Sequence, residues 1–436
     1  MTVKCDMKRI AITTLGCKTN QFESAAIHEN LTKEGFAVVP FEESADVYVI
    51  NTCTVTARTD AESRRLVRRA KRRNPEARIV VTGCYAQVAP EMLAAMPEVE
   101  LVIGNEEKGR LAALLKMGAG AERVLVADIN GISKAGSLRL ESFAEHTRAF
   151  MQVQNGCDSF CSYCIVPYAR GRSRSVPAEE VLQGVERFAG EGFREVVLTG
   201  IHLGNYGRDL SSPTSLLNLL EEIEGRNITP RLRLGSLEPL DITPEMIELV
   251  AASRMICPHL HIPLQSGSDT VLARMNRGYG SSYFHELISR IAAAVPDICL
   301  GCDVIAGFPG ETDKEFDDTV TLIKELPIAY LHVFPFSSRP GTKAAGMPGH
   351  LPSRVVTERA ELLRNLGAEK KQLYLQRFIG CDMDALALKR NGSGLWSGLT
   401  ANYLTVSFAG EGDLANSIVQ LRITETAGDG LAGVLQ

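Results

Sequence analysis

Short apolar runs that alternate with helical patterns are the feature that most constrains the fold of this chain. Strands that are connected through helices pair in parallel, and the helices then cover both faces of the sheet. The sequence therefore predicts a doubly wound parallel sheet in an α/β unit that ends near Asn130. The expected strands of this sheet are residues 9–15, 47–51, 78–82 and 101–103.

Further apolar runs follow from Ala149 onward, and helical patterns separate nearly all of them. Six β/α units in ~190 residues are too few for a closed barrel, which needs eight units and ~250 residues. We therefore expect an incomplete TIM-like (β/α)6 barrel, with active residues at the carboxyl ends of its strands. The expected strands are residues 149–154, 195–199, 231–237, 260–264, 298–306 and 330–336.

The end of the chain has short strand patterns with Gly or Asn turns between them, which predict a small OB-like β-barrel. Residues 131–147 are rich in Gly and Ser and lack clear periodicity, so we expect a linker there. A length of 436 residues is typical of two or three domains. The expected domains are residues 1–130, 148–370 and 371–436.

Composition and charge exclude several classes of protein. Apolar residues make up 45% and charged residues 23%, which is typical of globular rather than disordered or fibrous chains. A net charge of -5 excludes a uniformly basic nucleic-acid coat, although a local basic patch can still bind RNA. The sequence contains neither a signal-like apolar segment nor 18 consecutive apolar residues, so we expect a cytoplasmic protein without a membrane anchor.

The strongest chemical signal is the motif Cys157-x3-Cys161-x2-Cys164, directly after the first expected barrel strand. Three thiolates on one loop can bind three irons of a 4Fe-4S cluster and leave the fourth iron open. Zinc would normally require a fourth protein ligand. A c-type haem motif is excluded because Ile165, not histidine, follows Cys164. Three unrelated core cysteines are the remaining alternative.

This motif, with the aromatic Tyr163 before its last cysteine, resembles the signature of the radical S-adenosylmethionine (SAM) superfamily. The resemblance implies that the open iron binds the methionine moiety of SAM. Phe336 is expected either to flank the adenine or to belong to the core. Gly267 and Gly310 are expected either to let a ligand approach the backbone or to form turns. Other residues that resemble cofactor contacts are Thr199, Gly200, Ser236, Glu238, Gln265 and Ser266.

Three more cysteines, Cys17, Cys53 and Cys84, each end an expected strand of the amino-terminal sheet. Ligands of open α/β sheets bind beyond the carboxyl ends of the strands, so the three thiols can converge there. A second three-thiolate cluster is our hypothesis, and three buried apolar cysteines are the alternative.

Two open clusters in one chain resemble the radical SAM methylthiotransferases. The tail from Lys371 looks like the RNA-binding TRAM barrel of that family, and residues 14–20 and 198–207 look most like the branch that acts on threonylcarbamoyladenosine in tRNA. The resemblance implies methylthiolation of C2 of N6-threonylcarbamoyladenosine at position 37. The family's amino-terminal motifs match Gly16–Asn20, Asn51–Cys53 and Thr82–Cys84.

The resemblance also implies cofactors and partners. An electron would enter the cluster at Cys157, Cys161 and Cys164 and cleave SAM to a 5'-deoxyadenosyl radical, and a second 4Fe-4S cluster would hold the incoming sulfur. The expected partners are the tRNA anticodon stem-loop and an electron donor such as flavodoxin or ferredoxin, and no residue identifies the sulfur source. The alternatives are isopentenyladenosine in tRNA, a ribosomal protein side chain, or a non-catalytic iron-sulfur RNA-binding protein.

A basic helix is expected at residues 61–73, and we predict that its arginines contact RNA phosphates. Like charges four residues apart destabilise a helix, which favours this function over a merely solvated face. Trp396 or Tyr403 are candidates to stack on RNA bases. The predicted phosphate contacts are Arg64, Arg65, Arg68, Arg69, Arg72 and Arg73, while Arg170, Arg172 and Arg174 are expected either to add charge at the site or to pair with carboxylates.

Two smaller patterns lie within the expected barrel. Cys299 and Cys302 are three residues apart on a strand, so their thiols should face opposite sides of the sheet and not share a metal. His259 and His261 share one face of their strand, where packing is the favoured interpretation and a ligand-facing role the other.

Overall fold

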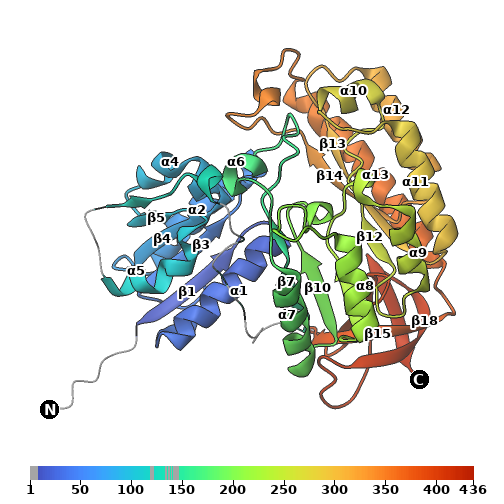
Figure 1. Cartoon of the computed structure of the whole chain (residues 1–436), viewed down its shortest axis with the longest axis horizontal. Helices are drawn as coiled ribbons and strands as arrows, with labels where there is room; N and C mark the ends of the chain where they lie inside the picture. Colours follow the sequence, from blue (N-terminus) through green and yellow to red (C-terminus); the bar gives the residue numbers. More distant parts are fainter. Residues whose placement is uncertain (1–7, 118–121, 133–134, 136–137, 139, 141–146) are drawn as a thin grey trace. The chain divides into compact units, whose positions relative to one another are not determined.

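The computed structural model describes residues 8–117, 122–132, 135, 138, 140 and 147–436, which form two compact units (Figure 1). Cys5 and most of the linker expected at 131–147 lie outside the described residues. Unit 1 comprises the described residues of Met1–Phe143, Gln154–Val176 and Ser337–Ala345, and unit 2 those of Ala144–Val153, Pro177–Phe336 and Gly346–Gln436.

Unit 1 contains a six-stranded sheet with the order β2-β1-β3-β4-β5-β6, in which every pair is parallel. The order reverses at β1 and β3, which makes the carboxyl ends of these two strands the topological switch point. The sequence did not predict β2 and β6, although the equally short β5 was predicted from its apolar run. The strands are β1 (Arg9–Thr14), β2 (Ala37–Val39), β3 (Val47–Thr52), β4 (Arg78–Gly83), β5 (Leu101–Ile103) and β6 (Val124–Leu125).

Helices cover both faces of this sheet (Figure 1). On β3, Val47 and Val49 contact the apolar core under α1 and α5, whereas Tyr48 and Ile50 contact the core under α2 and α4. This alternation follows from the two-residue period of a strand, and it confirms the doubly wound prediction. The helices are α1 (Lys18–Lys33), α2 (Ala57–Arg73), α3 (Cys84–Val88), α4 (Pro90–Ala94) and α5 (Leu111–Met117), with 3-10 turns η1 (Glu107–Arg110) and η2 (Ile129–Gly131).

The remainder of unit 1 contains a small hairpin and a short helix that packs against α3. Strands β8 (Gln154–Asn155) and β9 (Arg174–Ser175) are antiparallel, and helix α6 (Val166–Arg170) lies between them in the sequence. The hairpin thus brings together the two ends of the segment 156–173, which contains the three cysteines and α6.

Unit 2 contains two three-stranded parallel sheets, with the orders β11-β10-β7 and β12-β13-β14. Isolated parallel bridges from Leu232 to Ile256 and from Ser236 to His261 link β11 to the β12 side. Six parallel strands therefore follow one another in chain order, as the incomplete-barrel prediction requires. They are β7 (Ala149–Gln152), β10 (Glu195–Thr199), β11 (Arg231–Leu234), β12 (His259–His261), β13 (Cys299–Ala306) and β14 (Tyr330–Pro335).

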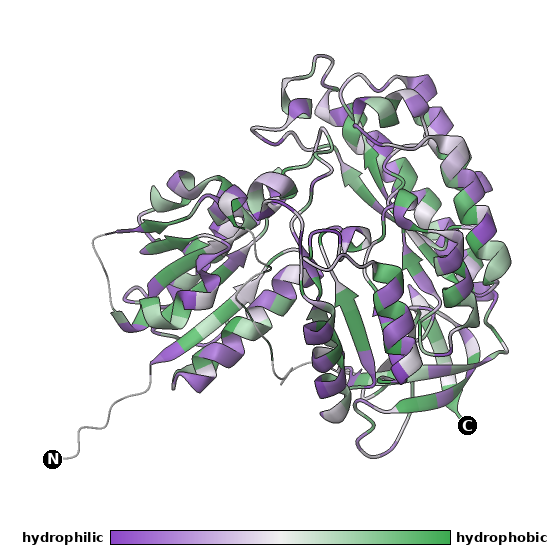
Figure 2. Cartoon of the chain, viewed as in Figure 1, coloured by the Kyte–Doolittle hydropathy of each residue, from purple (hydrophilic) through white to green (hydrophobic). Residues whose placement is uncertain are grey.

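The strands of unit 2 are mainly hydrophobic, whereas its helices mix hydrophobic and hydrophilic residues (Figure 2). Within the described ranges, no helix combines the length and the apolar character needed to cross a bilayer. The helices are α7 (Ala178–Gly190), α8 (Leu216–Arg226), α9 (Pro244–Ala252), α10 (Asp269–Arg274), α11 (Ser281–Ala294), α12 (Asp313–Glu325) and α13 (Ser353–Gln376), with 3-10 turns η3 (Leu203–Asn205), η4 (Pro239–Asp241) and η5 (Lys343–Gly346).

The chain ends in a closed five-stranded barrel with the order β15-β16-β17-β19-β18, which confirms the expected small β-barrel. Trp396 is buried in its core, so the predicted stacking of this residue on RNA is wrong. The ring of Tyr403 lies 4.2 Å from that of His259 and 5.0 Å from the Arg233 guanidinium, so it packs inside unit 2. The strands are β15 (Asp382–Arg390), β16 (Trp396–Thr400), β17 (Thr405–Phe408), β18 (Ile418–Ala427) and β19 (Gly430–Leu435).

A buried ion pair joins the small barrel to the strands of unit 2. Arg233 on β11 donates two hydrogen bonds to Glu195 on β10, at 2.8 and 2.9 Å, and both side chains are fully buried. Arg233 also donates to the carbonyls of Ala401 and Thr400. Burial tends to raise the pKa of Glu195, but the hydrogen bonds and charge of Arg233 outweigh it and lower that pKa. The pair therefore remains ionised.

Replacing Arg233 with Met should lower the free energy of unfolding by about 3 kcal/mol, because it leaves a buried carboxylate with only its 3.4 Å ion pair to Arg148. Urea unfolding can be followed by the fluorescence of Trp396, the single tryptophan of the chain. Arg422→Met is the control, because its ion pair with Asp382 is exposed and should contribute less than about 1 kcal/mol. Equal losses in the two variants would contradict the structural role of the buried pair.

Candidate iron-sulfur sites

Cys17, Cys53 and Cys84 lie at the carboxyl edge of the sheet in unit 1, beyond three neighbouring strands. Cys17 follows β1 and is the N-cap of α1, Cys53 follows β3, and Cys84 begins α3 directly after β4. Since β1, β3 and β4 are adjacent in the sheet, the structure brings the three cysteines to one place. That place is the topological switch point, where open α/β sheets bind their ligands.

Two glycines allow the backbone to approach Cys53 closely. Gly16 has a φ of +99°, and a Cβ built on it would lie 2.7 Å from the Cβ and 2.9 Å from the Sγ of Cys53. Gly83 has a φ of +100°, and its Cβ would lie 2.3 Å from the carbonyl oxygen of Thr52. Both contacts are too short for any residue with a side chain, so only glycine fits directly before Cys17 and Cys84.

The electrostatics of the three thiols fit a site that binds a cationic metal group. Burial raises the pKa of the Cys53 thiol to about 12, with further contributions from the nearby Cys84 and Cys17. Thiolates are the form that binds iron, so a cluster would have to displace these protons and supply the balancing positive charge. Cys17 is exposed, whereas Cys53 and Cys84 are buried, so one side of the thiol set faces solvent.

A buried group of charges borders Cys84. Nε of Arg170 lies 3.3 Å from the Cys84 sulfur, and the same guanidinium makes an ion pair with Glu23. Glu23 makes a second ion pair with Lys108, and all three charged side chains are buried. Burial alone would raise the pKa of Glu23, but Arg170 and Lys108 lower it to about 2. The Arg170 guanidinium is therefore a buried cation beside the thiols, held in place by Glu23.

Sequence reasoning missed Glu23 and Lys108, although one signal was available for Glu23. Its carboxylate lies on the buried face of α1, one turn after the motif residue Asn20. Asn20 donates to the carbonyls of Leu15 and Thr52, at 2.7 and 3.1 Å, and accepts a hydrogen bond from Arg170. Asn20 therefore ties together the two loops that carry Cys17 and Cys53.

The second cysteine set lies on the loop between β8 and α6. The amide of Cys157 donates to the carbonyl of Gly171 at 3.0 Å, and the amide of Cys164 donates to the carbonyl of Cys161 at 3.0 Å. A Cβ on Gly156 would lie 1.8 Å from the carbonyl oxygen of Arg172, so the residue before Cys157 must be glycine. The loop is thus held by its own backbone, and its three cysteines are half-buried, as is Tyr163.

The three arginines after this loop have different roles. Arg170 both pairs with a carboxylate and places charge at a cysteine, so both expectations for it hold. Arg172 makes an exposed ion pair with Asp158 at 3.3 Å. Arg174 donates to the carbonyls of Arg170 and Arg172 and thereby closes the loop.

The residues predicted to contact SAM in unit 2 lie at or beyond the carboxyl ends of the strands. Thr199 ends β10 and donates to the carbonyl of Met151 at 3.3 Å, and Gly200 follows it. Ser236 and Glu238 follow β11. The Ser236 hydroxyl lies 2.8 Å from Nδ1 of His261, and Glu238 makes an ion pair with Arg277.

The later residues of the predicted SAM set follow β12 and β14. Gln265 has a φ of +66°, and Ser266 is fully buried with its hydroxyl 3.2 Å from Oγ1 of Thr319. Phe336 packs edge-on against Phe308, with ring centroids 5.6 Å apart. Phe336 is half-buried, and the SAM contacts of all these residues remain a prediction.

The structure explains Gly267 and Gly310 without a ligand close to the backbone. A Cβ on Gly267 would lie 2.6 Å from the Cα of Thr319, so this glycine makes room for α12. Gly310 has a φ of +74°, and a Cβ on it would meet no other residue within 4 Å, so its conformation alone requires glycine. Neither residue therefore needs a ligand to explain it.

The arginines of α2 divide into two groups. Arg64 donates to the Tyr85 hydroxyl at 2.8 Å, and Arg73 donates to the carbonyl of Phe41, so both have structural contacts within unit 1. The other four arginines, Arg65, Arg68, Arg69 and Arg72, are exposed. The first three make surface ion pairs, Arg65 with Glu62, Arg68 with Glu98 and Arg69 with Glu42. Such exposed pairs are weak and do not prevent contact with a phosphate.

Comparison with known proteins supports an assignment to a family. Residues 9–104 match a family described as uncharacterized protein family UPF0004, and residues 151–323 match the radical SAM superfamily. The chain is 40% identical to threonylcarbamoyladenosine tRNA methylthiotransferase MtaB of Aquifex aeolicus, over 92% of this chain and 97% of that protein. It is 39% identical to the MtaB protein of Bacillus subtilis, over 96% and 94% of the two chains.

More distant likenesses fit the same assignment. The chain is 34% identical to a tRNA-2-methylthio-N(6)-dimethylallyladenosine synthase of Pelotomaculum thermopropionicum, over 98% of both chains. The fold is similar to that of the radical SAM methyltransferase TsrM of Kitasatospora setae, with a TM-score of 0.55 and 17% identity over 90% of this chain and 87% of that one. The identity to several full-length methylthiotransferases decides the assignment: the chain belongs to the radical SAM methylthiotransferase family.

Proposed function

We propose that this protein methylthiolates C2 of N6-threonylcarbamoyladenosine at position 37 of tRNA. The observation that carries the proposal is the convergence of Cys17, Cys53 and Cys84 at the switch point, beside an arginine from the second cysteine loop. Proteins that are about 40% identical to this chain over most of their length carry the name threonylcarbamoyladenosine tRNA methylthiotransferase. Relatives named for dimethylallyladenosine are 34% identical, so that nucleoside is the second candidate.

The donor sets of this chain fit two 4Fe-4S clusters, each with three protein ligands and one open iron. Cys157, Cys161 and Cys164 would hold the cluster that binds SAM, and Cys17, Cys53 and Cys84 would hold the other. The chemistry that these groups supply when bound is one-electron cleavage of SAM, which activates an unreactive C-H bond, together with a site for sulfur.

The chain's own side chains contribute charge and position. Arg170 places its guanidinium in a buried position beside Cys84, where it can offset the negative charge of a bound cluster, and Glu23 and Lys108 complete the buried ion-pair network. Glu23 and Asn20 also fix the orientation of the guanidinium, because both accept hydrogen bonds from it. This network keeps water out of the inner side of the site, since its members are buried.

The other parts of the proposal concern partners and compartment. The exposed arginines of α2 would contact phosphates of the anticodon stem-loop, and the small barrel would serve as a TRAM-type RNA-binding domain. An electron donor such as flavodoxin or ferredoxin would reduce the SAM cluster. A tRNA substrate and a chain with eleven cysteines fit a reducing cytoplasm.

The proposal predicts a defined change in cellular tRNA when Cys157 is replaced with Ala. Mass spectrometry of nucleosides should show that methylthio-threonylcarbamoyladenosine disappears, as in cells without the gene, while its unthiolated precursor accumulates. Cys381→Ala is the control, because this exposed cysteine belongs to neither set and should leave the nucleosides unchanged. If methylthiolated isopentenyladenosine, which is the dimethylallyladenosine product, disappears instead, the second candidate is the substrate. If no tRNA nucleoside changes, the proposal is refuted.

Replacing Arg170 with Met should weaken the cluster on Cys17, Cys53 and Cys84, because the thiolates lose their buried countercharge. Anaerobically reconstituted protein should contain clearly fewer than the about eight irons of two full clusters. The exposed Arg172→Met is the matched control and should keep its iron.

A variant with Ala at all three amino-terminal cysteines locates this effect. It should retain about four irons, and adding Arg170→Met should then remove few more. A large further loss would mean that Arg170 supports the loop at Cys157 instead. Unchanged iron in the triple variant would show that no second cluster exists.

Reversing Arg68 and Arg72 to Glu should abolish tRNA binding, or weaken it at least tenfold, because two phosphate contacts become repulsive. Filter binding at several salt concentrations should also give a smaller slope of affinity against salt. The double reversal Arg290→Glu and Arg364→Glu, on exposed positions of α11 and α13, changes net charge equally and is the control. Equal affinity of the two double variants would contradict the role of α2.

A further inference from the structure

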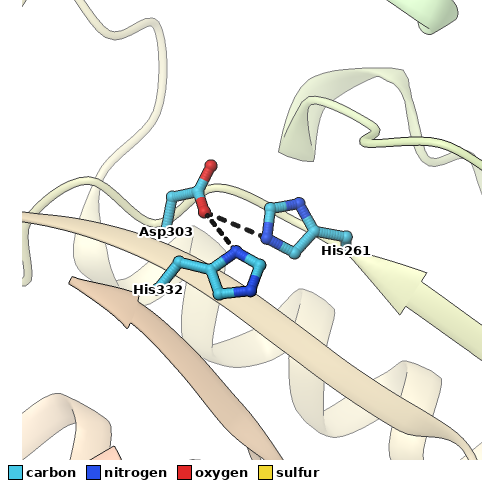
Figure 3. Close-up of side chains that lie close together, drawn as sticks. All are labelled: His261, Asp303 and His332. Carbon is cyan, nitrogen blue, oxygen red and sulfur yellow. Dashed lines mark ion pairs between the residues drawn. The ribbon is translucent and has the colours of Figure 1, made fainter. Parts of the chain in front are cut away.

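Two histidines and an aspartate lie together on one face of the β12-β13-β14 sheet in unit 2 (Figure 3). Asp303 on β13 and His332 on β14 are paired in the register of the two strands. His261 on β12 pairs with Gly301, two residues before Asp303, and residues two apart on a strand share a face. Three neighbouring strands therefore each deliver one side chain to the same point.

The distances from Asp303 to the two histidines match the spacing of ligands around one metal ion, and all three ligand atoms lie within 4.8 Å of one another. Oδ1 of Asp303 lies 3.0 Å from Nε2 of His261 and 3.3 Å from Nδ1 of His332, and both rings point toward this one oxygen (Figure 3). With metal-ligand bonds of about 2.1 Å, neighbouring ligands lie about 3.0 Å apart in octahedral and about 3.4 Å apart in tetrahedral geometry. Both measured distances fall near this range.

The closest of these contacts joins two buried polar atoms, Nε2 of His261 and Oδ1 of Asp303. Among the residues described in the structure, neither atom has a hydrogen-bond partner outside the triad. Because they lie 3.0 Å apart, the two atoms can satisfy each other only by sharing a proton or a cation. A cation between them would satisfy both.

The neighbour on the other side of the His261 ring favours metal binding. Its Nδ1 lies 2.8 Å from the hydroxyl of Ser236, which can accept the Nδ1 proton. That tautomer leaves the lone pair on Nε2, directed toward Asp303. Metal-binding histidines usually donate their second ring N-H to such a partner, which fixes both the tautomer and the ring orientation.

Tyr330 closes one side of the triad, and Gly301 makes room for it. A Cβ on Gly301 would lie 2.0 Å from the Tyr330 ring, and the ring lies 6.1 Å from that of His261 and 5.2 Å from that of His332. Access to solvent is on the other side, because the His332 side chain is 56% exposed and that of His261 only 10%. A bound ion would thus have three protein ligands and open positions.

We propose that His261, Asp303 and His332 form a mononuclear site for a divalent first-row transition metal, zinc or iron(II). Two imidazoles and one carboxylate with open positions are typical of both ions. Water or a carboxylate oxygen would fill the open positions. The site shares no residue with the two cysteine sets, so it does not depend on the proposed function.

Zinc distinguishes this site from the iron of the clusters. Cluster-loaded protein, incubated with zinc and then desalted, should retain about one zinc per chain more than Asp303→Asn and His332→Ala do. Iron content should be the same in all of them. His285→Ala, which changes a histidine on α11, is the control and should retain zinc like the unmodified protein. Zinc bound at cysteines would not differ between these proteins, so only the difference reports on the triad.

Anomalous diffraction locates the ion and identifies it. Crystals of the zinc-loaded protein should give a peak at the zinc edge between the three side chains, and crystals prepared with iron(II) alone should give one there at the iron edge. A peak at only one edge selects that ion. Equal zinc in the unmodified protein and both triad variants, or no peak at either edge, would overturn the proposal while leaving the cluster assignments untouched.

Discussion

The buried guanidinium of Arg170 is the interaction on which the organisation of unit 1 depends. A charge removed from water costs several kcal/mol unless it is fully compensated. Here the compensation comes from Glu23 and Asn20 on α1, while the guanidinium itself reaches the sulfur of Cys84. Because Arg170 ends the helix that follows Cys164, its burial requires that the sheet and the second cysteine loop assemble together. Six cysteines from distant parts of the sequence thus belong to one cooperative structure.

Much of this architecture could be predicted because it depends on local patterns. The strands show as apolar runs, and a cysteine directly after a parallel strand must lie at the carboxyl edge of the sheet, as Cys17, Cys53 and Cys84 do. The spacing of Cys157, Cys161 and Cys164 is local too. These residues needed no knowledge of tertiary contacts, and the same holds for the existence of the small barrel at the end of the chain, although not for the order of its strands.

The parts that could not be predicted depend on partners far apart in the sequence. Glu23 and Lys108 are 85 residues apart, and nothing local indicates that they share a buried ion pair. The triad of His261, Asp303 and His332 exists only because strand register aligns three side chains. The role of Trp396 could not be predicted either. An indole is suited equally to stacking on a base and to filling a core, and only the packing of the folded chain decides between these roles.

The attachment of the small barrel has a consequence for how such proteins diverge. Arg231 and Arg233 donate to main-chain carbonyls of Asp384, Leu399, Thr400 and Ala401, not to side chains of the barrel. A carbonyl is present whatever residue carries it, so these hydrogen bonds tolerate substitution on the barrel side, whereas the stacking of Tyr403 on His259 requires the aromatic ring. Substitutions on the outer surface of the barrel can therefore change which molecules the barrel binds without breaking its hydrogen bonds to the rest of unit 2.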